Sequence, residues 1–313
     1  MTRAFVTGIG GQDGSYLAER LLADGAEVHA LAHAAEPLPD LPGVELHAGD
    51  LTAVDDVRAL LQDLAPDEVY NLAAVSSVAR SWDEPHLTAQ VNGVAAAALM
   101  ESALLVQEKH GRLVRFVQAS SAEIFGEPDR APQDEATPVH PVNPYGAAKA
   151  YAHLMADVYR RRGLHAVSAI LYNHESPRRP EQFVTRKITS TVAAIAQGRA
   201  DRLALGNLDA RRDWGWAPDY VDAMVRAARA ERPGDYVVAT GVAHSVRDFV
   251  AAAFDRVGIA DWEPYVVVDP EFVRPADPTE LVGDATRART QLGWSPTVGF
   301  DEVVGLMVDA DLA

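Results

Sequence analysis

The sequence predicts an α/β fold, a doubly wound parallel sheet with a smaller lobe formed mainly by the C-terminal part of the chain. Three observations support this prediction. Short apolar runs alternate with helical patterns over residues 1–172, the strand-like runs are continuously apolar, and the first run ends in a group of glycines. Continuously apolar strands are typical of a parallel sheet whose two faces are both covered by helices.

The expected elements alternate along the first half of the chain. The expected strands share a high content of branched and aromatic apolar residues, and they are 3–7, 26–32, 44–48, 67–73, 113–121 and 165–172. The expected helices between them have apolar residues at helical spacing, and they are 12–24, 53–64, 86–108 and 144–162. After residue 173 the alternation stops, although 235–240 and 264–269 are expected to form further strands. The boundary near 173 is soft, because later helices can pack back on the first lobe.

The composition excludes several classes of function. The 313 residues carry a formal net charge of −17, whereas non-specific binding to nucleic acid or to a membrane surface needs basic surface. The absence of cysteine excludes disulfides, cysteine-ligated zinc and a thiol nucleophile. The first residues enter a strand without a signal peptide, and no uninterrupted apolar run approaches the ~18 residues of a membrane span. We therefore expect a soluble cytoplasmic protein that binds neither nucleic acid nor membrane.

A glycine-rich turn follows the first strand. In TGIGGQDG (7–14), Gly8, Gly11 and Gly14 stand between the strand and the next helix. Glycines there permit a tight turn, a close approach of pyrophosphate to the backbone and close helix–strand packing, although a merely tight turn is the alternative. With Gln12 and Asp13 in the same loop, the turn predicts a Rossmann-like dinucleotide-binding domain over residues 1–172. Residues 173–313 are then mainly a substrate lobe interleaved with it.

The ends of the next strands leave the choice between NAD and NADP open. A carboxylate after the second strand favours NAD and an arginine favours NADP, but LAHAAEPLP (31–39) places neither there. His33 contacts the adenosine or is a surface residue, and Asp50 accepts from the adenine amino group or caps the helix at 52–53. We also expect Leu51 and Leu72, both close to strand ends, among the cofactor contacts.

A second group of residues is typical of oxidoreductase chemistry. Tyr145 and Lys149 are four residues apart in NPYGAAK (143–149), so they share one face of a helix. A nearby ammonium lowers the pKa of a phenol, which makes tyrosine usable as a base. Ser121 ends the strand 113–121, and Glu123 follows it. Taken alone, Glu123 is best interpreted as a solvated loop acid.

The glycine turn, the strand-end serine and YGAAK together resemble the extended short-chain dehydrogenase/reductase superfamily. Longer segments resemble the GDP-mannose 4,6-dehydratase family, above all GQDGSYLAERLL (11–22), NHESPRRPEQFVTRKI (173–188), GNLDARRDWG (206–215) and LGWSP (292–296). The resemblance implies NADP as cofactor and a redox cycle that returns it unchanged. It also implies that Tyr145 takes the C4 hydroxyl proton, that Ser121 hydrogen-bonds the C4 oxygen, and that Glu123 removes the C5 proton before water is lost from C6.

Basic residues gather in the matched segments, where a nucleotide diphosphate would need them. They are Arg178, Arg179, Arg186, Lys187, Arg211, Arg212, Arg247 and Arg274. The resemblance assigns contacts with a nucleotide-sugar, GDP-mannose above all, to Asn173, Lys187, Arg212 and Arg274, and it places Thr185 and Arg186 close by. The alternative is that several pair with the acids Asp209, Asp213, Asp219 and Glu181. His174 and Glu175 are adjacent and lack a third ligand, so we expect no metal site.

Two departures from the family pattern stand out. The family carries an arginine-rich loop after the second strand, which holds the NADP 2′-phosphate and helps to build a tetramer, whereas this chain has His33-Ala34. NAD is therefore not excluded, and we expect a homodimer through the helices near 86–108 and 144–162, a tetramer remaining open. The family also carries a serine where this chain has Ala122, so the proton donor for the C6 oxygen is undetermined. Two competing functions are a nucleotide-sugar 4-epimerase or 4-ketoreductase and a non-catalytic dinucleotide-sensing protein.

Overall fold

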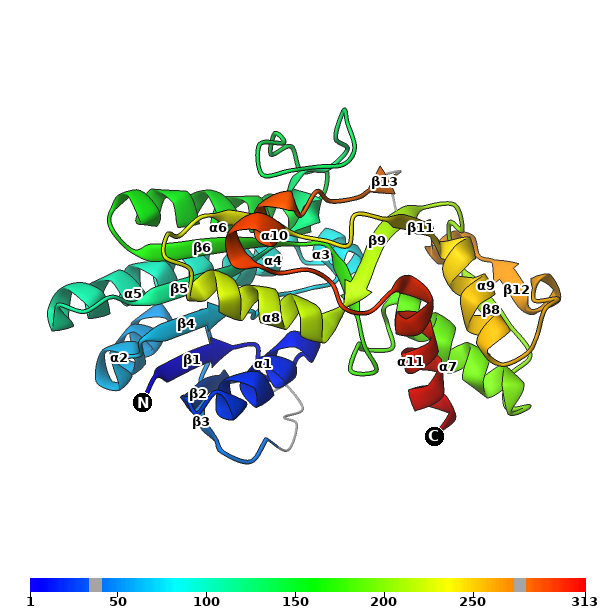
Figure 1. Cartoon of the computed structure of the whole chain (residues 1–313), viewed down its shortest axis with the longest axis horizontal. Helices are drawn as coiled ribbons and strands as arrows, with labels where there is room; N and C mark the ends of the chain where they lie inside the picture. The colour runs from blue at the N-terminus through cyan, green and yellow to red at the C-terminus, as the bar shows by residue number, and fades with distance from the viewer. Residues whose placement is uncertain (34–40, 273–279) are drawn as a thin grey trace.

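A seven-stranded parallel sheet forms the centre of the larger lobe in the computed structural model, which describes residues 1–33, 41–272 and 280–313 (Figure 1). The strand order is β10-β6-β5-β4-β1-β2-β3. This order reverses direction beside β1, as in the predicted doubly wound fold. The strands are β1 (Arg3–Thr7), β2 (Glu27–Ala32), β3 (Val44–Ala48), β4 (Glu68–Asn71), β5 (Arg115–Ser121), β6 (His165–Leu171) and β10 (Asp235–Val238).

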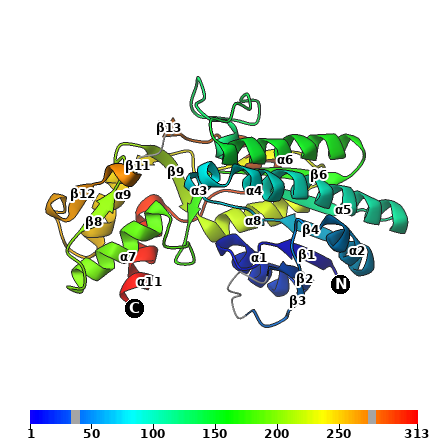
Figure 2. The ribbon, with the colours of Figure 1, turned by 180° about the vertical axis from the view of Figure 1, so that it is seen from behind.

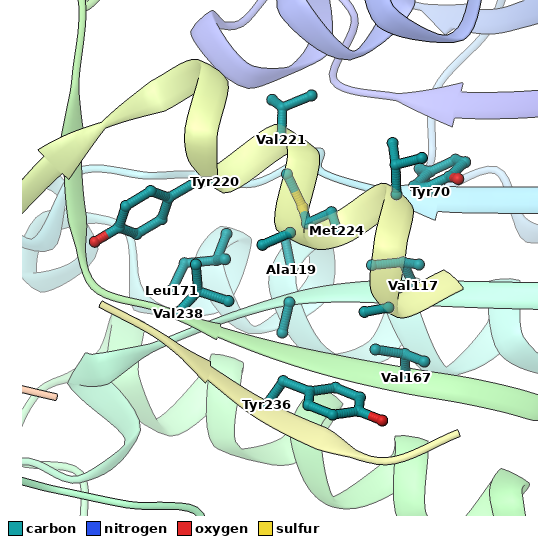
Figure 3. Close-up of a cluster of buried hydrophobic side chains, with 14 of the residues drawn as sticks. Tyr70, Val117, Ala119, Val167, Leu171, Tyr220, Val221, Met224, Tyr236 and Val238 are labelled. Carbon is teal, nitrogen blue, oxygen red and sulfur yellow. The ribbon is translucent and has the colours of Figure 1, made fainter. Parts of the chain in front are cut away.

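Helices cover both faces of this sheet because alternate strand residues are apolar on each side. Ala4 and Val6 pack with α1 and α8 on one face, whereas Phe5 packs with α2 and α5 on the other. Figure 3 shows Tyr220, Val221 and Met224 of α8 near the strand residues of the first face. The helices of this lobe are α1 (Gln12–Ala23), α2 (Val54–Leu64), α3 (Val78–Asp83), α4 (Pro85–Ala89), the π-helical η1 (Gln90–Ala95), α5 (Ala96–His110), α6 (Pro144–Arg161), α8 (Ala217–Ala228) and α10 (Thr286–Leu292).

The smaller lobe lies beside the larger one and has its own apolar core (Figures 1 and 2). Trp214, Phe249 and Phe254 are buried in that core. Its strands are β7 (Asn173–Glu175), β8 (Leu203–Leu205), β9 (Arg211–Trp216), β11 (Ala243–Ser245), β12 (Val266–Val268) and β13 (Glu280–Leu281). Its helices are α7 (Val184–Ala196), α9 (Val246–Arg256) and α11 (Phe300–Leu312). It also contains two short 3₁₀ turns, η3 (Glu263–Tyr265) and η4 (Pro270–Phe272), and the larger lobe contains one, η2 (Ala122–Ile124).

The predicted fold class is confirmed, and the two lobes are interleaved. The segment 235–240, expected as one of the later strands, supplies β10, which extends the large sheet beside β6. Helices α8 and α10 likewise return to the large lobe after β9 and β13.

One helix in the described part of the chain is long and apolar enough to cross a membrane by length and composition alone. It is the continuous stretch Pro85–His110, which is 26 residues long. Its most apolar window is 56% buried within the protein, as is usual for a helix that covers a sheet. The expectation based on uninterrupted apolar runs missed this stretch, because polar residues such as Asn92 and Ser102 interrupt it while lying buried themselves.

Candidate functional site

A cavity of about 240 Å³ lies where the carboxyl ends of β4, β5 and β6 meet the smaller lobe. Such strand ends beside the point where the strand order reverses are the usual binding place in this architecture. Eight of the residues expected from the sequence line the cavity. They are Asp13, Leu72, Ser121, Glu123, Tyr145, Lys149, Asn173 and Arg212.

The glycine turn brings the N-terminus of α1 directly against the strand ends. Gly8 has a φ of +75°, and a Cβ on it would lie 2.7 Å from the backbone nitrogen of Ala73. A Cβ on Gly14 would lie 2.1 Å from the carbonyl oxygen of Gly8. Gly11 is the N-cap of α1 and offers no side chain there. The turn formed by Gly8, Gly11 and Gly14, called the glycine cradle below, is therefore open to a phosphate group at a helix N-terminus.

Gln12 and Asp13 use their side chains to fix the loop that follows β6. Gln12 Nε2 donates to the carbonyl of His174 at 3.1 Å, and its Oε1 accepts from Ser176 Oγ at 2.8 Å. Asp13 Oδ2 lies 2.8 Å from His174 Nε2. Burial, the largest single influence, would raise the pKa of Asp13, but the charge of His174 and the hydrogen bonds from His174 and Gln12 together lower it. Burial would likewise lower the pKa of His174, but Asp13 and the Tyr172 carbonyl together raise it. His174 Nδ1 lies 2.7 Å from that carbonyl and Nε2 faces the Asp13 carboxylate, so both ring nitrogens donate and the two side chains form a buried ion pair.

The residues expected at the adenosine end lie apart from the cavity. Asp50 Oδ1 accepts from the backbone nitrogen and the hydroxyl of Thr52, both at 2.8 Å. These bonds lower the pKa of Asp50. The cap of α2 that the sequence suggested for Asp50 is wrong, because α2 begins at Val54 after Ala53. His33 Nε2 lies 3.9 Å from Asp50 Oδ2, and Leu51 is buried in the core under α2 and α5.

Tyr145 and Lys149 project from α6 into the cavity beside Ser121. Lys149 Nζ donates to the carbonyl of Ala119 at 2.9 Å and lies 5.8 Å from the centroid of the Tyr145 ring. Burial lowers the pKa of Lys149 to about 8, against the opposing charge of Asp13. Burial raises the pKa of Tyr145 to about 12, and the hydrogen bond with Ser121 only reduces that rise. The expected lowering of the phenol pKa is therefore wrong for the protein alone, because desolvation exceeds every favourable contact.

Asn143 connects Glu123 to the helix that carries the tyrosine. Its side chain caps α6 by accepting from Gly146 N at 2.7 Å, and its Nδ2 donates to Glu123 Oε2 at 2.8 Å. Gly146 allows this close approach, because a Cβ there would lie 2.5 Å from the carbonyl oxygen of Glu123. Ser121 Oγ accepts from Glu123 N at 3.2 Å, so its own proton remains available for another acceptor. The Glu123 carboxylate is thus held in place by Asn143 at the cavity, and it is not the solvated loop acid of the alternative interpretation.

The residues expected to contact a nucleotide-sugar divide into three groups. Asn173 and Arg212 line the cavity. Thr185, Arg186 and Lys187 do not line it, since Thr185 Oγ1 donates to Glu175 at 2.6 Å, Arg186 forms an ion pair with Asp311, and Lys187 lies over the Phe272 ring. Arg274 lies outside the described residues.

Several other basic residues pair with acids away from the cavity. Arg247 pairs with Asp209 at 3.1 Å, as the alternative predicted. Arg211 and Arg178 also pair with acids, but with Glu280 at 3.0 Å and Glu19 at 2.7 Å, which the sequence did not suggest as partners. The basic character of these segments therefore overstates the positive charge at the cavity.

Ser76, Ser77 and Gln182 also line the cavity, although no motif in the sequence marks them. His174 and Arg179 line it too, whereas the sequence suggested His174 only as a possible metal ligand and gave Arg179 no contact of its own among the basic residues. Both lie inside NHESPRR, whose match to the family is the signal for them. Ser76 and Ser77 follow β4 a few residues beyond the expected Leu72. Arg179 lies 3.3 Å from Glu175 and stacks on Phe183.

The geometry suits redox chemistry on a hydroxylated ligand. The open glycine cradle and the nearby ammonium of Lys149 fit a dinucleotide. The hydroxyl of Ser120 is 3% exposed, faces the same cavity and has no hydrogen-bond partner in the described residues. A buried hydroxyl without a partner fits a polar ligand group at this position. A phenol, a hydroxyl and a carboxylate then surround one site.

Comparison with known proteins gives consistent results. A family model described as GDP-mannose 4,6 dehydratase matches residues 5–307. A curated relative from Arabidopsis thaliana, GDP-mannose 4,6 dehydratase 1, is 44% identical over 99% of this chain and 89% of its own length. The Thermus thermophilus UDP-glucose 4-epimerase in complex with NAD is 29% identical with a TM-score of 0.85, covering 99% of each chain. RMD from Pseudomonas aeruginosa with NADPH is 26% identical with a TM-score of 0.81, covering 100% of this chain and 99% of that one.

Proposed function

Because the chain belongs to the GDP-mannose 4,6-dehydratase family, we propose that it converts GDP-mannose to GDP-4-keto-6-deoxymannose and water. The observation that carries this proposal is the position of Glu123 in the same cavity as Ser121, Tyr145 and Lys149. An epimerase or a simple ketoreductase needs the last three residues but has no step for a carboxylate at C5. A purely dinucleotide-sensing protein could use Lys149 to hold the cofactor, but it has no step for Ser121 or Glu123.

The chemistry that a bound nicotinamide dinucleotide would supply is reversible hydride transfer, from C4 of the sugar and back to C6. The glycine cradle at Gly8, Gly11 and Gly14 would hold its pyrophosphate, and Lys149 would hold its ribose hydroxyls near Tyr145. NADP is the cofactor that we propose from family membership. Titration of the purified protein with NADP and with NAD measures the preference directly.

The side chains of this protein would move the protons. Tyr145 accepts the proton of the C4 hydroxyl while Ser121 donates a hydrogen bond to the C4 oxygen. The ketone at C4 acidifies the C5 proton, and Glu123, held by Asn143, removes it. The protonated Glu123 then delivers that proton to the C6 hydroxyl, which leaves as water. A proton from solvent restores C5 when C6 is reduced, and Tyr145 releases the proton that it took.

Ala122 is the reason that we assign this double role to Glu123, with a water molecule as the alternative proton donor. Its side chain lines the cavity at 3% exposure and carries no ionisable group. Among the side chains of η2, Glu123 alone can supply a proton to a leaving oxygen. The guanidinium of Arg212 and the amide of Asn173, which also line the cavity, are suited to the diphosphate and the sugar hydroxyls.

We further propose a cytoplasmic homodimer formed through α6 and the continuous helical stretch Pro85–His110. Tyr151, Leu154 and Val158 form an apolar stripe at helical spacing on α6, with exposed fractions of 46%, 54% and 47%. Val94 adds a further exposed apolar residue at 56%. Such a stripe on a charged protein is typical of an isologous contact. Replacing Leu154 with glutamate should give a monomer in sedimentation-velocity runs if this stripe forms the contact.

NMR on the sugar tests the enzymatic proposal. Incubation with GDP-mannose and a catalytic amount of NADP should produce a new 6-methyl doublet and a 4-keto or hydrated carbon. Glu123→Gln should abolish both the product and the exchange of C5 with solvent deuterium, while Glu127→Gln, an exposed acid on the same loop, serves as the matched control. A product with an inverted C4 hydroxyl and no methyl group would establish the epimerase instead, and normal C5 exchange in Glu123→Gln would remove Glu123 as the base.

A further inference from the structure

A compact cluster of histidines and carboxylates lies on β2 and β3, outside the candidate active site. His29 and His47 place Nδ1 and Nε2 3.0 Å apart. Glu45 places one carboxylate oxygen 3.7 Å from His29 Nδ1 and the other 3.8 Å from His47 Nε2. One ligand atom from each of the three residues lies within 4.8 Å of the others. None of these residues lines the catalytic cavity.

The strand register brings the three side chains to one face of the sheet. His29 is paired with Glu45 across the two parallel strands, and His47 is paired with Leu31 two residues further along. Side chains of paired residues in a parallel sheet point to the same face, and so do side chains two residues apart. β3 is the edge strand of the sheet, so the cluster is open to ions from solvent on one side.

The hydrogen bonds of His29 fix which of its nitrogens is free. Its Nε2 lies 2.9 Å from Glu27 Oε1, and a carboxylate can only accept, so Nε2 carries the proton. In the neutral ring Nδ1 therefore presents a lone pair toward His47. The His29 side chain is 4% exposed, whereas that of Glu45 is 65% exposed, so the cluster is buried at His29 and faces solvent at Glu45.

We propose that His29, His47 and Glu45 bind one divalent metal ion of the zinc class, with a fourth position open to water. Two imidazoles and one carboxylate are ligands that zinc accepts, whereas magnesium and calcium prefer oxygen ligands. With metal–nitrogen bonds of about 2.1 Å, tetrahedral geometry separates two ligand nitrogens by about 3.4 Å. The observed 3.0 Å therefore needs an opening of only a few tenths of an ångström.

Glu27 and Arg3 complete the arrangement. Ligating histidines usually donate their second ring N–H to a carboxylate, which fixes the ring and raises its basicity. Glu27 occupies that position for His29 and is itself held by Arg3 at 3.1 Å. The ion would fasten the edge strand β3 to β2 at the side of the sheet that carries His33 and Asp50. Since no ligand residue belongs to the cavity, the metal would stabilise the lobe without entering the reaction.

Titration of metal-free, untagged protein with zinc chloride in a calorimeter tests the proposal. We expect one saturable site per chain and an increase in the melting temperature with zinc. Glu27→Gln keeps all three ligands and should weaken zinc binding about 10- to 100-fold. His47→Gln and the exposed Glu45→Gln should abolish the saturable site, with unchanged melting of the metal-free protein for Glu45→Gln. His110→Gln, an exposed histidine elsewhere, is the control and should bind zinc as the wild type does.

Cobalt provides a second readout, because Co²⁺ in a four-coordinate site with nitrogen ligands absorbs visible light much more strongly, and at longer wavelength, than hexaaquo cobalt does. The wild type should give this absorption at one equivalent, and His47→Gln should not. Absence of a saturable zinc site in the wild type would overturn the proposal. So would undiminished binding in both His47→Gln and Glu45→Gln, since the ion would then sit elsewhere.

Discussion

Asn143 gives the sharpest test of how the site is held together, because its side chain has two separable roles. Its Oδ1 caps α6 at Gly146, and its Nδ2 donates to Glu123. Asn143 is 4% exposed, so water does not readily replace either bond. Asn143→Ser keeps a good capping hydroxyl but is too short to reach Glu123. Asn143→Ala loses both contacts.

The magnitudes follow from the two contacts. Loss of an N-cap costs about 1 kcal/mol, and loss of a hydrogen bond to a charged group costs about 1.5 kcal/mol in a partly exposed setting. We therefore expect unfolding free energies lower by about 1.5 kcal/mol for Asn143→Ser and about 2.5 kcal/mol for Asn143→Ala. Because misplacement of a catalytic group by about 1 Å can cost about 100-fold in rate, both variants should lose at least tenfold in C5 exchange.

The assays are urea unfolding and solvent-deuterium exchange at C5, each with a matched control. Ser245→Ala removes the cap of α9 in the other lobe, where Ser245 Oγ accepts from Asp248 N at 3.0 Å. That control should lower stability by about 1 kcal/mol and leave exchange unchanged. Wild-type exchange in Asn143→Ser would refute the positioning argument, since the contact with Glu123 would then have no chemical consequence.

Asn143→Asp tests the same contact through charge. Aspartate caps a helix as well as asparagine does, but it would place a second carboxylate where Nδ2 now lies 2.8 Å from Glu123. Two carboxylates that close share one proton, because both cannot remain ionised. That proton must leave before Glu123 can act as a base, so the acid limb of the pH–rate profile should move to higher pH. An unmoved pH–rate profile would mean that the two carboxylates do not share a proton.

Three further predictions concern stability and cofactor binding. Burial lowers the pKa of Lys149 from 10.5 to about 8, so between pH 8 and pH 10.5 the unfolded state binds more protons than the folded state and stability rises with pH. Lys149→Met should therefore be about 3 kcal/mol more stable than the wild type at pH 7 without cofactor. In urea titrations this difference should shrink as the pH rises above 8. Asp213→Ala should cost roughly 3–5 kcal/mol in the same assay, because Asp213 is fully buried and accepts from two groups of Thr240 and from two backbone nitrogens. Gly14→Ala should weaken NADP binding at least tenfold by calorimetry, since its Cβ would lie 2.1 Å from a carbonyl oxygen, whereas Gly299→Ala, where a Cβ meets nothing within 4 Å, should not.

The fold was predictable because the central strands show their burial in their composition. Phe5 and its neighbours Ala4 and Val6 pack on opposite faces of the sheet, and a run with no polar face has few alternatives to a central parallel strand. The place of β10 was not predictable from its own residues, since a short apolar strand pairs equally well in either sheet. Its partner is decided by the helix α8, which returns the chain to the large lobe.

The candidate site was predictable where one short motif carries it, and unpredictable where two distant segments meet. Tyr145 and Lys149 are four residues apart on one helix, so their shared face follows from helical geometry. The link between Asn143 and Glu123 joins residues twenty positions apart, and the pair Arg186–Asp311 joins α7 to α11. No periodicity encodes such pairs. The histidine cluster of β2 and β3 escaped notice for the same reason, because its ligands come from two strands whose register the sequence does not give.

The pKa of Tyr145 shows why motif chemistry needs the surrounding structure. The motif supplies an ammonium near a phenol, and the stretch QASSAEIFG (118–126) supplies Ser121 as hydrogen-bond partner. Burial nevertheless holds the pKa of Tyr145 at about 12, and it also lowers the pKa of the Lys149 ammonium. Both shifts come from desolvation, so a polar dinucleotide in the same cavity would act on both residues at once. The protein alone therefore keeps its base protonated, and we expect a bound cofactor and sugar to lower the pKa of Tyr145 by restoring part of its lost solvation.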